Sequence, residues 1–163
     1  MNQSKMLVAM LAMGCTAAAQ GALGDYKADL AKVDAKLQAC TNSGAASNQR
    51  LKACQWLAYE ETDKILNSSY QQLVASLKRQ ALEDKTTRVA YGGLTYAEET
   101  LNRLVASERA WIRFRDAECR FQGAYNLGGT GEEAAISDCL TNMTKQRILS
   151  INELLHGVLT PGK

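Results

Sequence analysis

The chain has few of the residues that break helices, bind metals or carry acid–base chemistry. Its 163 residues contain one proline, Pro161, and one histidine, His156, both near the carboxyl terminus. Proline interrupts a helix because it lacks the backbone N–H and clashes with the preceding turn, so no interior helix is interrupted in this way. There is no Cys-x-x-Cys pair, and His156 has no acid or nucleophile in a recognisable motif beside it. We therefore expect neither a metal site nor a cofactor.

The chain also lacks a large excess of positive or negative charge. The sequence has 19 Lys and Arg against 17 Asp and Glu, a net charge of +2. So small an excess gives no support to a nucleic-acid or membrane-surface partner. Carboxylates occur in adjacent pairs, at Glu60-Glu61, Glu98-Glu99 and Glu132-Glu133, but a glycosidase needs two carboxyls held across a cleft. The last two pairs lie at predicted helix amino termini, where negative charge stabilises the helix dipole. The sequence therefore favours a binding protein over an enzyme.

The amino-terminal end has the pattern of an export signal. Lys5 supplies a positive charge, residues 6–13 are an apolar run, and Ala17 to Ala19 provide small residues at a signal-peptidase site. The run is about half of the roughly 20 apolar residues that a membrane-spanning helix needs. We predict that residues 1–19 are a signal peptide and that cleavage after Ala19 leaves residues 20–163 in the periplasm as a single domain. Loss of Lys5 leaves a net charge near +1.

A lipid anchor at Cys15 is the alternative. Gly14 and Cys15 follow the apolar run, as they do at the end of a lipoprotein signal. Such a signal has a branched aliphatic residue three positions before the cysteine and a small residue two before. This chain has Ala12 and Met13 there, so cleavage after Ala19 is favoured.

Four cysteines remain in the mature chain: Cys40, Cys54, Cys119 and Cys139. An even number in a small exported chain is typical of a disulfide framework. Three pairings are open, and we favour the sequence-local one, Cys40–Cys54 with Cys119–Cys139, because it closes two short loops. Each loop would stabilise the fold by about 3 kcal/mol in the chain-entropy account.

Apolar residues recur every three or four positions through nearly all of the mature chain, which is the period of a helix packed on one side. This spacing predicts a first helix over residues 24–38. A polar loop over residues 41–48 follows, in which Ser47 or Asn48 caps the second helix. The second helix is long and carries an apolar stripe along one face: Leu51, Cys54, Leu57, Ala58, Ile65, Leu66, Tyr70, Leu73, Val74 and Leu77.

Two capping boxes predict where the later helices begin, after an irregular stretch over residues 84–95. Thr95 with Glu98 opens the third helix, and Thr130 with Glu133 opens the fourth, which Gly157 and Pro161 end. The inward residues of the third helix are Leu101, Leu104, Val105, Glu108, Trp111, Ile112, Arg115 and Cys119. Those of the fourth are Cys139, Leu140, Met143, Arg147, Ile148, Ile151, Leu154 and Leu155. The predicted fold is all-α, a single-domain antiparallel helical bundle of about four helices stapled by two disulfides.

Residues 120–138 form the strongest candidate for binding. They are predicted to be a loop between two cysteines, and a loop anchored by a disulfide would enter the cleft of a basic protein with little loss of conformational freedom. An ordinary turn between two helices is slightly favoured over this binding role. The candidate contact residues in this segment are Tyr125, Asn126, Glu132 and Glu133.

The two tryptophans have different expected roles. Trp111 lies on the apolar stripe of the third helix, so core packing is favoured over partner binding. Trp56 lies off the stripe of the second helix and is expected to be partly exposed. Tryptophan is enriched at the centres of protein interfaces, so Trp56 is a further candidate contact.

Arg115 and Asp116 are adjacent, and neighbouring helical residues point about 100° apart. We therefore expect Arg115 to reach an acid or carbonyl on a neighbouring helix. Asp116 is expected to reach a base such as Arg147, and both ion pairs would fix the register of the helices. Asn67 and Tyr70 share a helix face and are expected to make a buried polar contact between helices.

Several of these residues stand in runs that resemble the LprI-like lysozyme-inhibitor family of bacterial envelope proteins. The most specific run includes Trp111, Phe114, Arg115, Asp116 and Cys119 and is similar to the family's Trp-x-x-Phe-Arg-Asp-x-Glu-Cys segment. Residues 66–70 are similar to its Leu-Asn-x-x-Tyr run, and Cys139 with Met143, Thr144 and Arg147 to its Cys…Met-Thr-x-x-Arg ending. With the Cys40 and Cys54 pair, the resemblance spans residues 40–147 and leaves out the first predicted helix.

The resemblance implies a helical, disulfide-bonded envelope protein that binds and inhibits lysozyme. We expect a protein partner of this kind, a peptidoglycan-cleaving enzyme blocked by steric occlusion, and no cofactor. An immunity protein against an envelope-targeting toxin and a non-catalytic envelope structural or assembly factor are the alternatives.

Overall fold

A computed structural model describes residues 26–44, 47–83 and 92–159. The predicted signal peptide, Cys15 and Pro161 lie outside the described residues, as does most of the irregular stretch before Thr95. The described residues form four α-helices and one short 3₁₀ helix: α1 (Tyr26–Asn42), α2 (Asn48–Glu83), α3 (Tyr96–Gly123), η1 (Ala124–Asn126) and α4 (Glu132–Leu159). Within these ranges, no helix combines the length and the apolarity needed to cross a bilayer.

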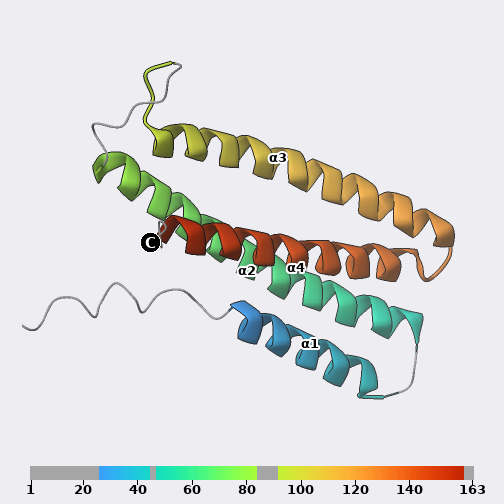
Figure 1. Ribbon diagram of the computed structural model, residues 1–163. Coiled ribbons are helices and arrows are strands. Elements are labelled where there is room, and N and C mark those ends of the chain that lie inside the picture. Colours follow the sequence, from blue (N-terminus) through green and yellow to red (C-terminus); the bar gives the residue numbers. More distant parts are fainter. Residues whose placement is uncertain (1–25, 45–46, 84–91, 160–163) are drawn as a thin grey trace, which may run out of the picture.

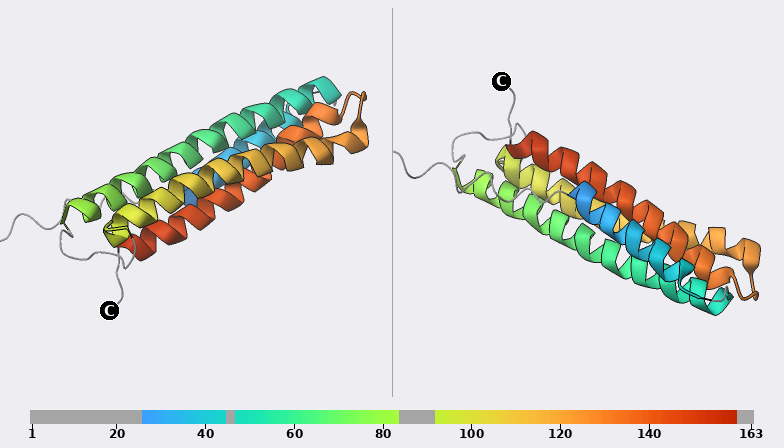
Figure 2. Two further views of the ribbon diagram at one scale, coloured as in Figure 1. Left: turned by 90° about the horizontal axis from the view of Figure 1, so that it is seen from above. Right: turned by 90° about the horizontal axis from the view of Figure 1, so that it is seen from below.

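The helices form an antiparallel bundle, which confirms the predicted fold class. Each helix runs opposite to the one before it, so α2 and α4 run in the same direction (Figures 1 and 2). These two helices make the most extensive contact of any pair. Helix α1 lies against one side of the α2–α4 pair and α3 against the other, and no contact between α1 and α3 is found in the described residues. The α1–α2 connection and the α3–α4 hairpin lie at the same end of the bundle.

Local capping explains where two of the helices begin. The Ser47 hydroxyl accepts a hydrogen bond from the Arg50 backbone N–H at 3.2 Å, which satisfies one free donor at the start of α2. Thr95 and Glu98 form the predicted capping box before α3, since each side chain accepts from the other's backbone N–H, at 3.2 and 2.6 Å.

The second predicted capping box is wrong. Helix α4 begins at Glu132, so Gly131 rather than Thr130 occupies the capping position. The Thr130 hydroxyl instead accepts a hydrogen bond from Asn48 at 2.6 Å, and the Glu133 carboxylate forms an ion pair with Lys52. Both side chains therefore bind residues of α2 instead of capping the start of α4.

Two helix ends also differ from the prediction. Helix α1 continues to Asn42, four residues past the predicted end. Helix α4 passes through Gly157 and continues to Leu159. A single glycine destabilises a helix by only about 1 kcal/mol relative to alanine, and the packed turn before it offsets that cost. Leu155 in that turn is 1% exposed.

The apolar core has two parts. A large cluster fills the middle of the bundle, with Leu66 and Leu73 of α2 facing Ile148 and Ile151 of α4. A smaller cluster around Cys119, Cys139 and Leu140 lies toward the α3–α4 hairpin. Four residues of the predicted stripes are exposed: Leu51, Leu57, Ile112 and Leu154. Spacings of three and four alone let a stripe drift around a helix, and these positions lie beyond the face that the neighbouring helices cover.

Small hydroxyl side chains are buried on both α2 and α4. They are Thr62, Ser69 and Ser76 on α2 and Ser137, Thr141 and Thr144 on α4. Most of these hydroxyls donate to the carbonyl four residues earlier, as Thr62 does to Ala58 at 2.7 Å and Thr141 does to Ser137 at 2.8 Å. Because the polar atom is satisfied within its own helix, the side chain packs as a small residue. The most extensive helix contact in the bundle is therefore only partly made of large apolar residues.

Both predicted disulfides are present. Cys40 is bonded to Cys54 and Cys119 to Cys139, with Cα–Cα distances of 5.8 and 5.4 Å. The first joins the end of α1 to the start of α2, and the second joins α3 to α4 at the base of their hairpin.

Replacing both cysteines of either disulfide by alanine should lower the free energy of unfolding by about 3 kcal/mol, because the unfolded chain regains the freedom of the opened loop. Loss of the Cys119–Cys139 bond should be the more damaging, since Cys119 is fully buried within a core cluster. Urea unfolding of the two double variants and the oxidised parent measures the difference. Equal unfolding midpoints for all three proteins would contradict a stabilising role for the bonds.

Candidate functional site

The α3–α4 hairpin is shorter and more ordered than the predicted 120–138 loop. Helix α3 continues through Gly123, η1 follows, and α4 begins at Glu132, so only residues 124–131 lie between the two long helices. The prediction of a long loop was wrong because helix propensity carries both helices past the cysteines. Gly123 lets the two helices meet, since a Cβ atom there would lie 2.5 Å from Cγ1 of Ile136.

Three contacts hold this hairpin in place beyond its disulfide. The Gly128 backbone N–H, at a φ of +71° that favours glycine, donates to the Glu132 carboxylate at 2.9 Å. Asn48 of α2 donates to Thr130, and Lys52 pairs with Glu133. Glu132 and Glu133 were predicted to contact a partner, and in the structure both carboxylates stabilise the hairpin itself.

The tip of the hairpin is highly exposed. The side chains of Tyr125 and Leu127 are 87% and 77% exposed, and Asn126 between them is exposed as well. The backbone of a tethered turn is already held in place, so a partner that binds these side chains does not have to order the turn. We refer to Tyr125, Asn126 and Leu127 as the hairpin tip.

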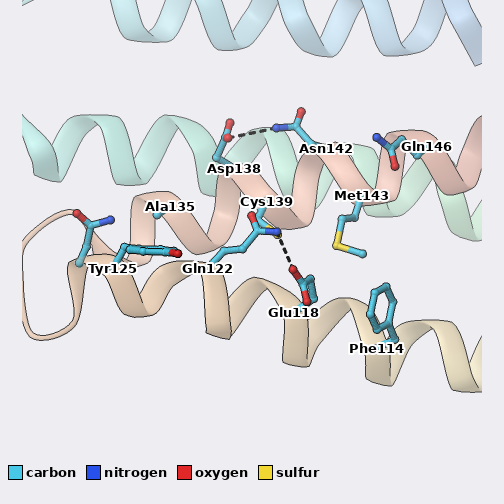
Figure 3. Close-up of a pocket in the computed structure, with 11 residues that line it drawn as sticks. Phe114, Glu118, Gln122, Tyr125, Ala135, Asp138, Cys139, Asn142, Met143 and Gln146 are labelled. Carbon is cyan, nitrogen blue, oxygen red and sulfur yellow. Dashed lines mark hydrogen bonds between the residues drawn. The ribbon is translucent and has the colours of Figure 1, made fainter.

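A groove runs beside the hairpin between α3 and α4 (Figure 3). Its volume is about 860 Å³. Phe114, Glu118 and Gln122 project from α3 toward α4, and Met143 projects from α4 toward them. The groove is lined by Phe114, Glu118, Gln122, Tyr125, Asn126, Ala135, Asp138, Cys139, Asn142, Met143 and Gln146.

Trp56 lies on α2, outside the groove lining. Its ring is 47% exposed, as predicted, and lies 5.4 Å from the ring of Tyr59. The indole N–H donates to Glu60 at 3.0 Å. Trp56 and the hairpin tip therefore present two separate aromatic surfaces, and the structure does not join them into one site.

Arg115 is buried at the meeting point of three helices. Only 5% of the residue is exposed. Its guanidinium donates to Asp63 of α2 at 3.2 Å and to Thr144 of α4 at 3.2 Å, so the predicted contact with an acid on a neighbouring helix is confirmed. The rings of Tyr59 and Trp111 lie 5.5 and 5.2 Å from the guanidinium carbon. These distances allow cation–π attraction on top of the ion pair.

The predicted pairing of Asp116 with Arg147 is wrong. Asp116 accepts from its own neighbour, Arg115, at 3.0 Å from Nε and 2.9 Å from Nη2. The two Cβ atoms diverge, but the arginine side chain is long enough to turn back to the adjacent carboxylate. Arg147 pairs instead with the buried Glu108 at 2.7 Å, and its guanidinium lies 5.6 Å from the Trp111 ring. Trp111 packs against the large core cluster, which confirms its predicted structural role.

Two groups in the Arg115 cluster, Tyr59 and Arg115 itself, have shifted pKa values. Burial raises the pKa of the Tyr59 hydroxyl above its ordinary value, although Arg115 acts to lower it. Burial acts to lower the pKa of Arg115, but the surrounding phenol and carboxylates outweigh it and raise the pKa above its ordinary value. Arg115 therefore remains charged throughout the physiological pH range.

Asn67 and Tyr70 do not make the predicted buried contact between helices. Asn67 is exposed and donates to the backbone carbonyl and the carboxylate of Asp63, at 2.9 and 3.1 Å within its own helix. Tyr70 is half-buried and packs against the large core cluster. Because Asn67 holds one oxygen of Asp63 while Arg115 takes the other, the asparagine orients a partner of the buried guanidinium.

Comparison with known proteins places this arrangement in a family. The model of the lysozyme inhibitor LprI family matches residues 40–150, which is more than half of the chain. The chain belongs to the lysozyme inhibitor LprI family. The match includes both disulfides, the Arg115 cluster, the hairpin and the groove, and most of α1 lies outside it.

An uncharacterized protein of Rhizobium meliloti (strain 1021) is 32% identical over 111 residues, which are 68% of this chain and 76% of that protein. No solved structure shows a significant match. The LprI family is an inhibitor family. The described residues contain no group of three or more His, Cys, Asp or Glu able to hold a metal ion.

Replacing Arg115 by alanine should lower the free energy of unfolding by about 3 kcal/mol, the lower end of the range for breaking a buried ion pair, because Asp63 and Asp116 are partly exposed and can be hydrated. Arg113 is exposed on the same helix, so Arg113→Ala is the matched control and should change stability by less than about 0.5 kcal/mol. Urea unfolding compares the two variants. Similar midpoints for Arg115→Ala and Arg113→Ala would show that the buried cluster does not hold the helices together.

Proposed function

We propose that the mature protein acts in the periplasm, where it inhibits a lysozyme-type peptidoglycan hydrolase by steric occlusion with its hairpin tip. The main observation that supports this proposal is the exposure of Tyr125 and Leu127 at the hairpin tip. The turn that carries them is held by a disulfide and by contacts with α2. Tyrosine is one of the residues that most often anchor a protein interface, so Tyr125 is the expected anchor and Leu127 adds apolar contact area beside it. Membership of a lysozyme-inhibitor family supports a lysozyme-type enzyme as the partner.

Charge around the hairpin supports the same proposal. Residues 118–142 contain four acidic side chains, Glu118, Glu132, Glu133 and Asp138, and one basic side chain, Arg120. A local negative charge accelerates the encounter with a basic enzyme and makes the association rate fall as salt is added. The apolar tip would then supply the short-range contact, and the surrounding acids would act mainly on the association rate.

Replacing Tyr125 by alanine should raise the concentration needed for half-inhibition by about tenfold or more, because an interface anchor is lost. The assay is the lysis of a peptidoglycan suspension by a c-type lysozyme in the presence of the oxidised mature protein. Tyr96→Ala is the matched control, since Tyr96 is 68% exposed but lies at the start of α3, at the other end of the bundle. Trp56→Ala tests the second aromatic surface in the same assay.

Each outcome of that assay bears on a different part of the proposal. Inhibition that saturates at a fixed molar ratio and weakens only in Tyr125→Ala would support the hairpin tip. Weakening in Trp56→Ala alone would move the contact to α2 and overturn the role of the tip. Absence of inhibition at large molar excess would exclude c-type lysozyme as the target.

The exported protein should begin at Gln20 and carry no lipid. Mass measurement of the intact chain from a periplasmic extract tests this directly, because cleavage after Ala19 removes Cys15. A membrane-bound chain that begins at Cys15 with attached acyl groups would contradict periplasmic release and support the lipid anchor.

A further inference from the structure

Phe114 has an unusual position for a phenylalanine. The chain has two phenylalanines, and neither is in the core: Phe114 is 57% exposed and Phe121 is 66% exposed, both on α3. Single exposed apolar residues are ordinary on protein surfaces. Phe114 differs from Phe121 because it lines the α3–α4 groove, where Met143 of α4 lies across from it (Figure 3).

The groove has the size and shape of a site for an extended ligand. Its volume of about 860 Å³ lies within the range of roughly 300–1,000 Å³ that is usual for small-molecule sites. Its lining on α4 runs from Ala135 to Gln146, which is about 16 Å along a helix. Because the helices are antiparallel, Tyr125 lies toward one end of the groove and Phe114 toward the other (Figure 3).

The walls between the two aromatic rings are rich in carboxamides. Gln122 and Asn142 donate to Glu118 and Asp138, at 3.0 and 3.2 Å, which fixes one amide on each wall and leaves its carbonyl free to accept. The amides of Asn126 and Gln146 have no hydrogen-bond partner among the described residues. A carboxamide both donates and accepts, and so does a sugar hydroxyl.

The lining also excludes other ligand classes. It contains no lysine or arginine, so a phosphate, a nucleic acid or an anionic lipid headgroup would find no cation to pair with. Most of its residues are polar, which does not suit an acyl chain or the apolar face of a helix. The two carboxylates of the lining, Glu118 and Asp138, already accept hydrogen bonds from the groove amides Gln122 and Asn142. The lining therefore favours a neutral ligand with many hydroxyls and apolar C–H faces, because those faces pack on aromatic rings while the hydroxyls reach the amides.

We propose that the α3–α4 groove is an oligosaccharide-binding site that takes a short stretch of the N-acetylated glycan of the bacterial cell wall, which it contacts through the neutral hydroxyl and acetamido groups of the sugars. Phe114 and Tyr125 would stack on sugar rings, and Asn142 and Gln146 would bond their hydroxyl and acetamido groups. The wall glycan is chosen because it is the polymer that a lysozyme cleaves, so inhibitor and enzyme meet on it. The choice of this polymer rests on the proposed function, whereas binding of a sugar in the groove is measured without the enzyme.

Titration of the oxidised mature protein with chitotetraose, a β-1,4-linked tetramer of N-acetylglucosamine, tests the site by two-dimensional NMR. Backbone signals of the groove residues should shift and saturate. Phe114→Ala should weaken binding by about tenfold or more, and Gln146→Ala by about fivefold because one hydrogen-bonding group is lost. Phe121→Ala is the matched control, since it removes an equally exposed ring from the same helix outside the groove, and it should leave binding unchanged.

Three results would overturn the proposal. They are the absence of shifts at millimolar sugar, shifts confined to residues outside the groove, and equal weakening by Phe114→Ala and Phe121→Ala. Preserved dispersion of the spectrum would show that each variant is folded. The titration contains no lysozyme, so a failure here is separate from a failure of inhibition. Normal glycan binding with no inhibition would leave the groove proposal intact and overturn only the occlusion mechanism.

Discussion

Arg115 is a permanent charge in the interior of a small helical bundle, and removing such a charge from water is costly unless its partners are in place. Its partners come from α2, α3 and α4 at once: Asp63, Asp116 and Thr144, with the rings of Tyr59 and Trp111 close to the guanidinium. Apolar packing alone tolerates small rotations and shifts of helices, whereas a planar guanidinium with fixed donors does not. We infer that this cluster sets the register of the three helices, and Asn67 contributes by orienting Asp63.

The register that the Arg115 cluster sets also determines how α3 and α4 meet at the hairpin. Cys119 is one helical turn beyond Arg115 on α3, and Cys139 lies little more than a turn before Thr144 on α4, so the disulfide forms directly beside the charged cluster. From that bond the chain needs only a short turn, which Gly123 makes possible by its close approach to Ile136. The tip and the groove are therefore positioned by rigid helices rather than by a flexible loop, which is the arrangement that precise recognition requires.

The sequence predicts the features of this fold that depend on neighbouring residues in the chain. The four helices, the Thr95–Glu98 capping box and the sequence-local disulfides are of this kind. Features that depend on tertiary contacts are missed, because Thr130 and Glu133 bind α2 in place of capping α4. One local contact is missed as well, since the long Arg115 side chain turns back to pair with the adjacent Asp116. The buried hydroxyls of Thr62 and Ser69 are missed because an apolar pattern counts them as polar, although their bonds to the preceding turn make them pack as small residues. The groove has no sequence signal, because its walls combine polar and apolar residues from two helices that lie far apart in the chain.

Tyr125 and Asn126 belong both to the hairpin tip and to the end of the groove, so the two proposed ligands are neighbours on one surface. An enzyme that covers the tip would displace a bound glycan from the Tyr125 ring alone, and the Phe114 end of the groove would still hold it. Phe114 and Gln146 lie farther along the groove, and Leu127 is not part of its lining, so these residues separate the two activities. A tip that enters an enzyme cleft beside a groove that holds wall glycan would keep the inhibitor on the polymer where its target works. In that arrangement weak sugar binding is sufficient, since tethering to the polymer raises the local concentration of the inhibitor near the enzyme.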